Sequence, residues 1–407
     1  MISFKRLVLV AGLFTACCAA NASAQVPAEP DVSKLRVKLG PVYLDPTLAL
    51  TNAGVDTNVF NDADDAGPQK DFTITVSPKT AVWMGMGRTW LNANITEDIV
   101  WYKKFKSERS ANSDYKVSWL VPLTRVSFVV GGDALITRER PGFEIDARAQ
   151  RSELAGNGAL EIRALTKTFF GFKGERRHIA FQKDQVFLGN NLHDELTRTA
   201  STEALTIRNE LTPLTNLVIE VGREQERFDY DPLRDSNSTL VNVGVKFDQL
   251  ALIKGGMTAG FRDFEPAASG VQGFKGFTTA VDLTYVLLGS TRFQFGTTRD
   301  VQYSYDVNQP YYVQTGVTGS LTQQIFGPFD LQGRVGAARL AYRTREDVTV
   351  VDPNRVDHTR TFGLGLGYHM GADVRLAFNL DWNKRESVLT NRTYHGLRYG
   401  TAITYGF

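Results

Sequence analysis

The side chains best suited to acid–base chemistry or metal binding are the histidines, which are His178, His193, His358, His369 and His395. None of them forms an H-x-x-H or H-x-x-x-H pair, the spacing that brings two metal ligands to one face of an element. Both cysteines, Cys17 and Cys18, fall in a segment that we expect to be removed, so the mature chain has no thiol nucleophile and no cysteine metal site. We therefore predict neither a metal centre nor a cofactor.

A catalytic site also finds little support in the sequence. The nucleophile motif G-x-S-x-G does not occur. His178, Asp184, His193 and Asp194 could be arranged as a hydrolase site, but the ordinary polarity of an exposed loop explains them equally well. Gly363-Leu-Gly-Leu-Gly367 looks superficially like a phosphate-binding loop. Its glycines alternate with apolar residues and no helical pattern follows, so we interpret them as small residues of a strand. No enzymatic activity is predicted.

The elements that position these residues are strands. Phe362, Leu364, Leu366 and Tyr368 alternate with three glycines, and the same period of two recurs from residue 41 to the end of the chain. The pattern predicts eighteen strands, with sixteen as the main alternative, at 46–54, 72–83, 89–104, 113–122, 124–135, 151–164, 168–181, 197–210, 216–228, 236–247, 251–264, 275–287, 291–304, 311–324, 329–344, 356–369, 374–386 and 394–407.

The connections between these strands alternate in length. Phe326-Gly-Pro-Phe329 and Met370-Gly-Ala-Asp373 are short, whereas Gln182–Thr197 and Thr344–Val356 are long and polar. This rhythm is typical of a transmembrane barrel, with short turns in the periplasm and long loops outside. In lipid every backbone N–H and C=O must be paired within the protein, so the sheet has to close. We predict an all-β protein, a transmembrane antiparallel β-barrel, with a soluble sandwich or propeller as the alternative.

The polar rows opposite the apolar rows are expected to face the lumen, because a charge at mid-depth on the lipid face costs about 2–4 kcal/mol. The residues assigned to this inner surface are Lys116, Arg163, Lys173, Glu220, Lys246, Lys254, Arg262, Arg292, Arg334, Arg375 and Arg398. Further acidic residues on these rows are Asp114, Glu161, Glu175, Asp282 and Asp381. The balance favours a mildly cationic lumen. The alternative is that many of these charges form ion pairs that brace the wall.

The start of the chain predicts export. Lys5 and Arg6 precede an apolar stretch, and Ala22-Ser23-Ala24 matches a cleavage site, so residues 1–24 are expected to be a signal peptide. A short membrane anchor and a lipoprotein acylated on Cys17 are the alternatives. Residues 25–40 would form a periplasmic lead-in and residues 41–407 the barrel. Without Lys5 and Arg6 the basic and acidic residues are equal in number, which gives no reason to expect a nucleic-acid partner.

The last stretch of the chain is expected to close the barrel. Ile403, Tyr405 and Phe407 form the apolar row of a strand that ends the sequence. A terminal phenylalanine on such a strand resembles the assembly signal of bacterial outer-membrane β-barrels. The resemblance implies a location in the cell outer membrane, contact with outer-membrane lipid, and recognition of the chain by the barrel-assembly machinery.

The first barrel segment carries a second resemblance. Leu48-Ala-Leu-Thr-Asn-Ala-Gly-Val-Asp-Thr-Asn-Val-Phe60 is similar to the D-x-N-V/I-F opening of outer-membrane barrels of the beta-barrel porin 2 type, and the similarity of style continues to Trp119. Beyond that point only the rhythm of the strands matches. The resemblance implies a channel that takes part in exopolysaccharide secretion together with polysaccharide export components. A general diffusion porin for small solutes and a structural or adhesive barrel are the alternatives.

Overall fold

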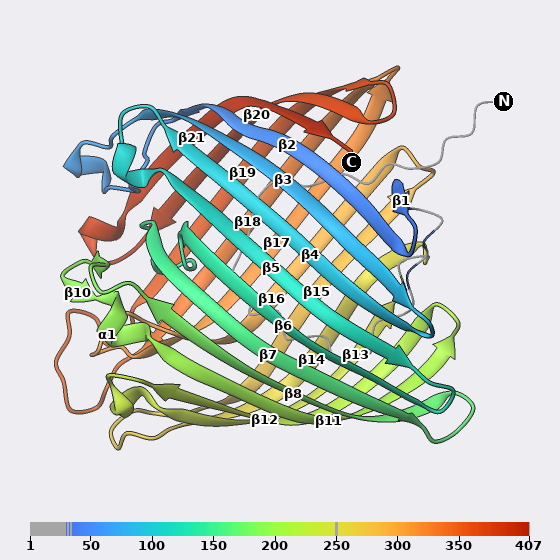
Figure 1. Cartoon of the computed structure of the whole chain (residues 1–407). Coiled ribbons are helices and arrows are strands. Elements are labelled where there is room, and N and C mark those ends of the chain that lie inside the picture. The colour runs from blue at the N-terminus through green and yellow to red at the C-terminus, as the bar shows by residue number, and fades with distance from the viewer. Residues whose placement is uncertain (1–29, 31, 33–34, 249–250, 407) are drawn as a thin grey trace.

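The structure is a computed structural model, which describes residues 30, 32, 35–248 and 251–406. These residues form a closed antiparallel barrel of 18 strands that run obliquely around the wall (Figure 1). The short β1 (Val37–Leu39) pairs antiparallel with the start of the first barrel strand, β2. The barrel strands are β2 (Val42–Asp56), β3 (Asp71–Met86), β4 (Thr89–Tyr102), β5 (Ser110–Pro122), β6 (Val126–Glu139), β7 (Ala149–Arg163), β8 (Thr168–Phe181), β11 (Arg198–Thr212), β12 (Thr215–Phe228), β13 (Ser236–Phe247), β14 (Ile253–Pro266), β15 (Phe274–Leu287), β16 (Thr291–Tyr303), β17 (Tyr311–Phe326), β18 (Phe329–Arg343), β19 (Val356–Met370), β20 (Val374–Glu386) and β21 (Tyr394–Tyr405).

The predicted all-β barrel and its eighteen strands are confirmed, and the sixteen-strand and soluble alternatives are wrong. The first strand shows how the boundaries differ. The sequence predicts 46–54, whereas β2 already begins at Val42, before Pro46. Proline lacks the N–H that a ladder needs. At Pro46, however, β2 is paired with β3 through Thr80, and its pairing with β21 starts only at Leu48. The open edge accommodates the proline.

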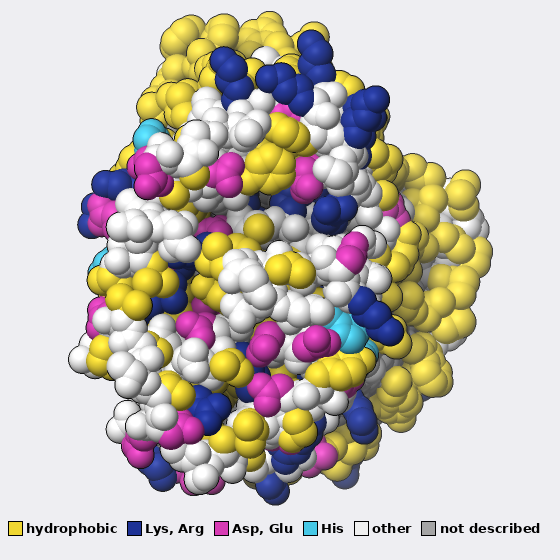
Figure 2. Space-filling model, turned by 90° about the vertical axis from the view of Figure 1, so that its left-hand side faces the viewer, with side chains coloured by type: hydrophobic (Ala, Val, Ile, Leu, Met, Phe, Trp, Pro, Cys, Tyr) yellow, Lys and Arg dark blue, Asp and Glu magenta, His cyan; other side chains and the backbone are white. Residues whose placement is uncertain are grey.

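Each strand presents one row to the outside and one to the lumen. In β19, Phe362, Leu364 and Leu366 point outward with 51%, 58% and 50% of their surface exposed, whereas the three glycines between and beside them are buried on the inner side. The outward rows together form a hydrophobic belt around the barrel (Figure 2). Lipid on one face and a polar interior on the other therefore account for the period of two along the sequence.

The two ends of the barrel differ. Short turns join the strands at the end where β1 lies, and longer connections join them at the other end, which carries α1 (Leu192–Leu196) and the hairpin of β9 (Val186–Phe187) and β10 (Asn190–Asn191) (Figure 1). In outer-membrane barrels the long loops face outward and the short turns face the periplasm. The long connections also contain the short helices η2 (Asp64–Ala66), η3 (Lys106–Glu108), η4 (Pro232–Arg234) and η5 (Thr390–Arg392). In the part of the chain that the structure describes, no helix has the length and apolar character of a membrane span.

The barrel closes where β2 pairs with β21. This seam is broken by a bulge between Leu50 and Ala53, in which Asn52 has a φ of 54°. Asparagine tolerates this left-handed conformation better than most residues. Beyond the bulge, Gly54 and Gly400 lie opposite each other, and a Cβ on Gly400 would come within 2.9 Å of the Gly54 Cα. The close approach of the two strands therefore depends on glycine at this position.

Some expected features at the two ends of the chain fall on residues that the structure does not describe. Residues 1–24, the expected signal peptide, and Phe407 of the expected assembly signal lie outside the described residues. Within the expected lead-in, the guanidinium group of Arg36 donates a hydrogen bond to the carbonyl oxygen of Pro46 at 2.8 Å and another to that of Gly406. Arg36 thereby joins the start of β2 to the end of β21 at the turn side of the barrel.

Candidate functional site

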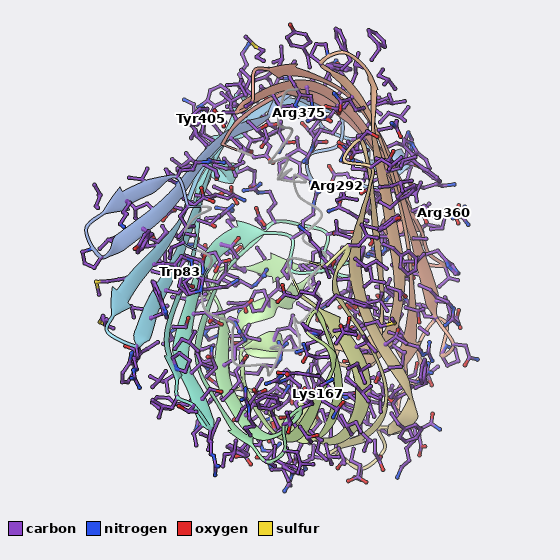
Figure 3. The ribbon with its side chains drawn as sticks, turned by 90° about the vertical axis from the view of Figure 1, so that its right-hand side faces the viewer. Trp83, Lys167, Arg292, Arg360, Arg375 and Tyr405 are labelled. Carbon is purple, nitrogen blue, oxygen red and sulfur yellow. The ribbon has the colours of Figure 1, made fainter. Side chains whose placement is uncertain are left out.

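The barrel lumen and its loop-side end form the candidate site. The pairing register puts all eleven residues that were assigned to the lumen from the sequence on inward rows. Figure 3 looks into the barrel from the turn side and shows Arg292 of β16 and Arg375 of β20 on the inside, whereas Arg360 of β19 points away from the barrel. Ile403 and Tyr405 lie on the outward row of β21, with 44% and 55% of their surface exposed.

The lumen is not the mildly cationic surface that the sequence predicts. Carboxylates that were not assigned to the inner rows bind inward arginines. Arg262 of β14 is bound by Glu224 of β12 and, at 3.1 Å, by Asp300 of β16. Near the loop side of β12 and β16 both rows are polar, so the sequence pattern gave no signal for the inward direction. Negative charges therefore offset the positive ones along the wall.

Most of the predicted lumen cations take part in ion pairs. Besides Arg262, the pairs are Lys116 with Asp114 (3.2 Å), Lys173 with Glu220 (2.7 Å), Arg334 with Asp381 (2.6 Å), Arg375 with Asp330 (2.6 Å) and Arg398 with Asp56 (2.7 Å). Arg163 lies over the ring of Phe169 at 5.1 Å. Lys246 and Lys254 have no ion-pair partner within 4.0 Å among the described residues. The alternative of ion pairs that brace the wall accounts for the majority of these charges.

Several of these ion pairs cross a whole strand, and two of them cross β19. Arg334 of β18 reaches over β19 to bind Asp381 of β20, and Arg375 of β20 reaches over β19 in the opposite direction to bind Asp330 of β18. Asp330 is 1% exposed and also contacts a ring nitrogen of His369 at 2.7 Å. Each pair is thus a lateral tie across three strands on the inner surface.

The glycines of β19 make these ties possible. A Cβ on Gly363 would come within 2.7 Å of the Arg334 Nε, and a Cβ on Gly367 within 2.6 Å of the Arg375 Nε. Real Cβ contacts are not this short, so any side chain there would push the guanidinium group off the wall. The glycines of Gly363-x-Gly-x-Gly367 therefore leave room on the inner surface of β19 for the two arginine side chains. The whole pattern is part of a strand, as the sequence predicts.

A Gly367→Val variant is expected to lose about 3 kcal/mol of unfolding free energy, because the displaced Arg375 leaves the buried Asp330 without its main partner. Urea titration of the folded barrel in lipid vesicles measures the loss. Gly333→Val is the matched control, since the Gly333 Cβ position on β18 has nothing within 4 Å and should cost less than about 1 kcal/mol. Equal losses of unfolding free energy for the two variants would contradict the role given to Gly367.

The connection between β6 and β7, residues 140–148, folds into the lumen and is called L3 below. L3 is bound by residues of strands and connections that are far from β6 and β7 in the sequence. Arg385 of β20 donates hydrogen bonds to the carbonyl oxygen of Phe143 at 2.6 Å and to the carboxylate of Asp146 at 3.2 Å. From the connection between β16 and β17, the hydroxyl of Ser304 donates to Glu144 at 2.6 Å. L3 therefore crosses the lumen at its loop side and narrows it.

A buried ion network holds L3 in this position. Arg385 has 0% of its surface exposed and also binds Asp357 of β19, which accepts a further hydrogen bond from Arg355 at 2.7 Å. Arg392, in the connection between β20 and β21, binds the second carboxylate oxygen of Asp146 at 2.7 Å. Removing one partner from such a buried pair typically costs about 3–5 kcal/mol, because the remaining charge has no solvent. The network therefore fixes L3 against the opposite wall.

Glu144 of L3 is 1% exposed. Burial raises the pKa of its carboxyl group above the ordinary value, although the Ser304 hydroxyl and the guanidinium groups of Arg355 and Arg392 oppose the shift. The backbone N–H of Tyr305 also donates to this carboxyl group at 3.1 Å. Because the docked loop favours the neutral acid, proton uptake at Glu144 and docking of L3 favour each other.

An apolar cluster completes the packing around L3. Ile145 packs with Phe187 and Leu192 of the connection between β8 and β11, and with Tyr305 of the connection between β16 and β17. Figure 2 shows the side chains of the described loop residues covering the middle of this end of the barrel. The loop side of the barrel is thus a packed constriction rather than a wide mouth.

Sequence reasoning missed the residues that form this constriction. Arg385, Arg392, Glu144 and Asp146 were not assigned to any site. One local signal was available, since Phe143-Glu-Ile-Asp146 alternates apolar and acidic residues inside a long polar connection. Apolar side chains at Phe143 and Ile145 of a polar loop indicate that the loop packs against other parts of the protein.

The residues considered for a rim hydrolase have separate partners. The ring of His178, on the outward row of β8, lies 3.1 Å from the Thr199 hydroxyl, and Asp184 accepts a hydrogen bond from the adjacent Gln185 at 2.8 Å. His193 contacts Asp194, its neighbour in α1, at 2.9 Å. The described residues contain no group of three or more His, Cys, Asp or Glu side chains that could hold a metal ion. The structure assembles no nucleophile and base from these positions.

Comparisons with known proteins add the following. A family model described as "Putative beta-barrel porin 2" matches residues 36–405. No curated protein matches the chain. Solved structures similar to it include OccK1 (OpdK) of Pseudomonas aeruginosa, with 10% identity over 89% of this chain and 98% of that one and a TM-score of 0.48. OprD of the same organism has 8% identity, coverages of 92% and 97% and a TM-score of 0.45. A BenF-like porin from Pseudomonas fluorescens Pf-5 has 10% identity, coverages of 90% and 98% and a TM-score of 0.47.

Proposed function

The chain belongs to the putative beta-barrel porin 2 family and is an outer-membrane β-barrel of the porin type, and from this premise we propose that it is a diffusion channel for small polar solutes. The observation that carries the proposal is L3, which Arg385 and Arg392 hold across the lumen. An 18-stranded wall is wide enough for an aqueous channel, and a loop docked inside it limits the size of what can pass. Charged side chains of both signs keep this passage hydrated.

Secretion of an acidic exopolysaccharide, the first expectation from the sequence, has less support. It rested on the family resemblance and on a cationic wall that would steer acidic sugars. Most of the wall cations have carboxylate partners, as in the pairs of Arg262 with Glu224 and Asp300, so much of the attraction for a polyanion is cancelled. A polymer would also have to pass the docked L3. These features favour the alternative of a small-solute porin.

The proposal is tested by reconstituting the full mature protein in planar bilayers and in vesicles. We expect stable conductance steps, and vesicle swelling that falls steeply as the permeating sugar becomes larger. Replacing residues 141–147 of L3 by a Gly-Gly linker should raise the conductance and relax the size limit. The control removes residues 349–351, mostly exposed residues of the connection between β18 and β19, and should leave both unchanged.

The opposite outcome is equally clear. If folded protein, identified by its heat-modifiable gel mobility, conducts no ions with or without L3, the diffusion channel is wrong. Loss of surface polysaccharide in a deletion strain would then support secretion, and unchanged polysaccharide would support a structural or adhesive barrel.

A further inference from the structure

The outer surface of β18, β19 and β20 changes from apolar to basic toward the loop side. Arg339 and Arg343 follow the apolar outward residues of β18, Arg360 lies one outward position beyond Phe362 on β19, and Lys384 lies one beyond Trp382 on β20. We call Arg339, Arg343, Arg360 and Lys384 the basic patch. Figure 3 shows Arg360 pointing away from the barrel, and Figure 2 shows Lys and Arg side chains gathered along the upper border between the loop face and the hydrophobic belt.

The strand register brings the members of the basic patch together. Arg360 is the direct neighbour of Lys384 across β19 and β20. Arg339 is the direct neighbour of His358, which is the next outward residue of β19 beyond Arg360. The cations therefore occupy adjacent positions on three adjoining strands rather than scattered points of the surface.

The positive charge of the basic patch is only partly neutralised. Glu386 binds Lys384 at 2.7 Å and lies 3.6 Å from Arg360, and it is the one carboxylate that ion-pairs with the patch among the described residues. Arg339 is exposed and forms no hydrogen bond or ion pair with any described residue. Elsewhere on the outer surface, the exposed Lys275 has its own partner in Asp263 at 2.8 Å. The basic patch thus differs from a surface on which each basic side chain has its own carboxylate partner.

The position of the basic patch in the membrane identifies the environment of these charges. The long loops mark the outside of the cell, so the loop-side border of the belt lies at the headgroups of the outer leaflet. A basic side chain on the lipid face costs about 2–4 kcal/mol at mid-depth but only about 0–1 near the interface. Arginine and lysine can bury their aliphatic stems along the belt while their charged groups reach the headgroups.

We propose that the basic patch binds a phosphorylated glycolipid of the outer leaflet through two of its phosphate groups. Guanidinium groups bind phosphate oxygens in a bidentate fork, which makes arginine suited to this ligand. Neighbouring strands lie about 4.8 Å apart, so cations on β18, β19 and β20 extend over about 10 Å. One phosphate group does not span that distance, whereas two phosphates at opposite ends of a disaccharide do. The glycolipid is held by the wall and does not enter the lumen.

The test compares the wild-type protein with the triple variant Arg339→Gln, Arg360→Gln, Lys384→Gln. Both proteins are purified as full mature chains from outer membranes and placed in nanodiscs of defined lipid. Native mass spectrometry then counts the glycolipid molecules that remain bound to each protein. We expect the wild type to retain the bisphosphorylated glycolipid. The triple variant should retain at most about one tenth of that amount. Glu386→Gln should retain more than the wild type, because it removes the competing carboxylate.

The control is Arg176→Gln together with Arg223→Gln, outward arginines of β8 and β12 that lie outside the basic patch. Heat-modifiable gel mobility verifies that every variant is folded. Equal retention by the wild type and the triple variant would overturn the proposal. Equal binding of a monophosphorylated glycolipid or of phosphatidylglycerol would overturn the assignment of two phosphates and leave a general anionic-lipid surface in its place.

Discussion

An Arg385→Ala variant is expected to open a wider channel than the wild type, with a raised single-channel conductance and frequent transitions between levels. Arg385 donates to Phe143 and Asp146 of L3 and binds Asp357 of the wall, with none of its side chain exposed to solvent. Its loss leaves Asp146 paired only with Arg392 and Asp357 paired only with Arg355, so the cation that joins L3 to the wall is gone. At about 3–5 kcal/mol, the change lowers the ratio of docked to undocked L3 by at least about a hundredfold. Planar-bilayer recordings measure the effect directly.

The same substitution at Arg176, an outward arginine of β8, is the control and should leave the conductance unchanged. Heat-modifiable mobility of both proteins separates an open channel from a misfolded one. A second variant, Asp146→Asn, keeps Arg385 but weakens its contact with L3 and should give an intermediate conductance. If Arg385→Ala and Asp146→Asn both remain folded and conduct like the wild type, L3 does not control the passage.

Replacing Ile403 by aspartate is expected to abolish most insertion into the outer membrane. Ile403 lies on the outward row of β21, between Leu50 of the first strand and Leu376 of β20. A charge at this position faces lipid, where it is costly in a depth-dependent way. It also lies on the last strand, which closes the barrel by pairing with β2. Deleting Phe407 should act in the same direction if it serves as the expected assembly signal. Cell fractionation and protease digestion measure the surviving folded protein.

Thr404→Asp is the matched control for Ile403→Asp. It introduces the same charge one residue further along β21, on the inward row opposite Ala49 and Arg375. We expect it to insert at close to the wild-type yield, because its carboxylate faces the lumen rather than lipid. Equal yields for Ile403→Asp and the wild type would contradict the importance given to the lipid-facing row of β21 for insertion.

The fold could be predicted because the membrane imposes its two environments on every strand. In β19 a side chain such as Leu364 meets lipid while its neighbour Gly363 meets the lumen, so residue type reports direction without knowledge of the partner strand. The same reasoning put Arg334 and Arg375 on the inward rows. It could not predict that they lie flat on Gly363 and Gly367, because that depends on the register of three strands.

The constriction could not be predicted for a related reason. L3 is positioned by residues far away in the sequence, such as Arg385 and Arg392, and nothing local in residues 140–148 specifies where the loop docks. The charge of the lumen was mispredicted because Glu224 and Asp300 lie where both rows of their strands are polar. Period-two reasoning fails wherever the chain leaves the bilayer, since water is then on both sides.

The seam between β2 and β21 has a mechanical consequence. Its ladder is interrupted at the bulge around Asn52, whereas β20 and β21 pair without a break from Val374↔Tyr405 to Arg385↔Tyr394. Under a pulling force applied to the C-terminus, the interrupted ladder yields before the continuous one. The wall would then tear along this line, and β21 would leave together with β20. The barrel would come apart as successive hairpins, beginning at the place where it was closed.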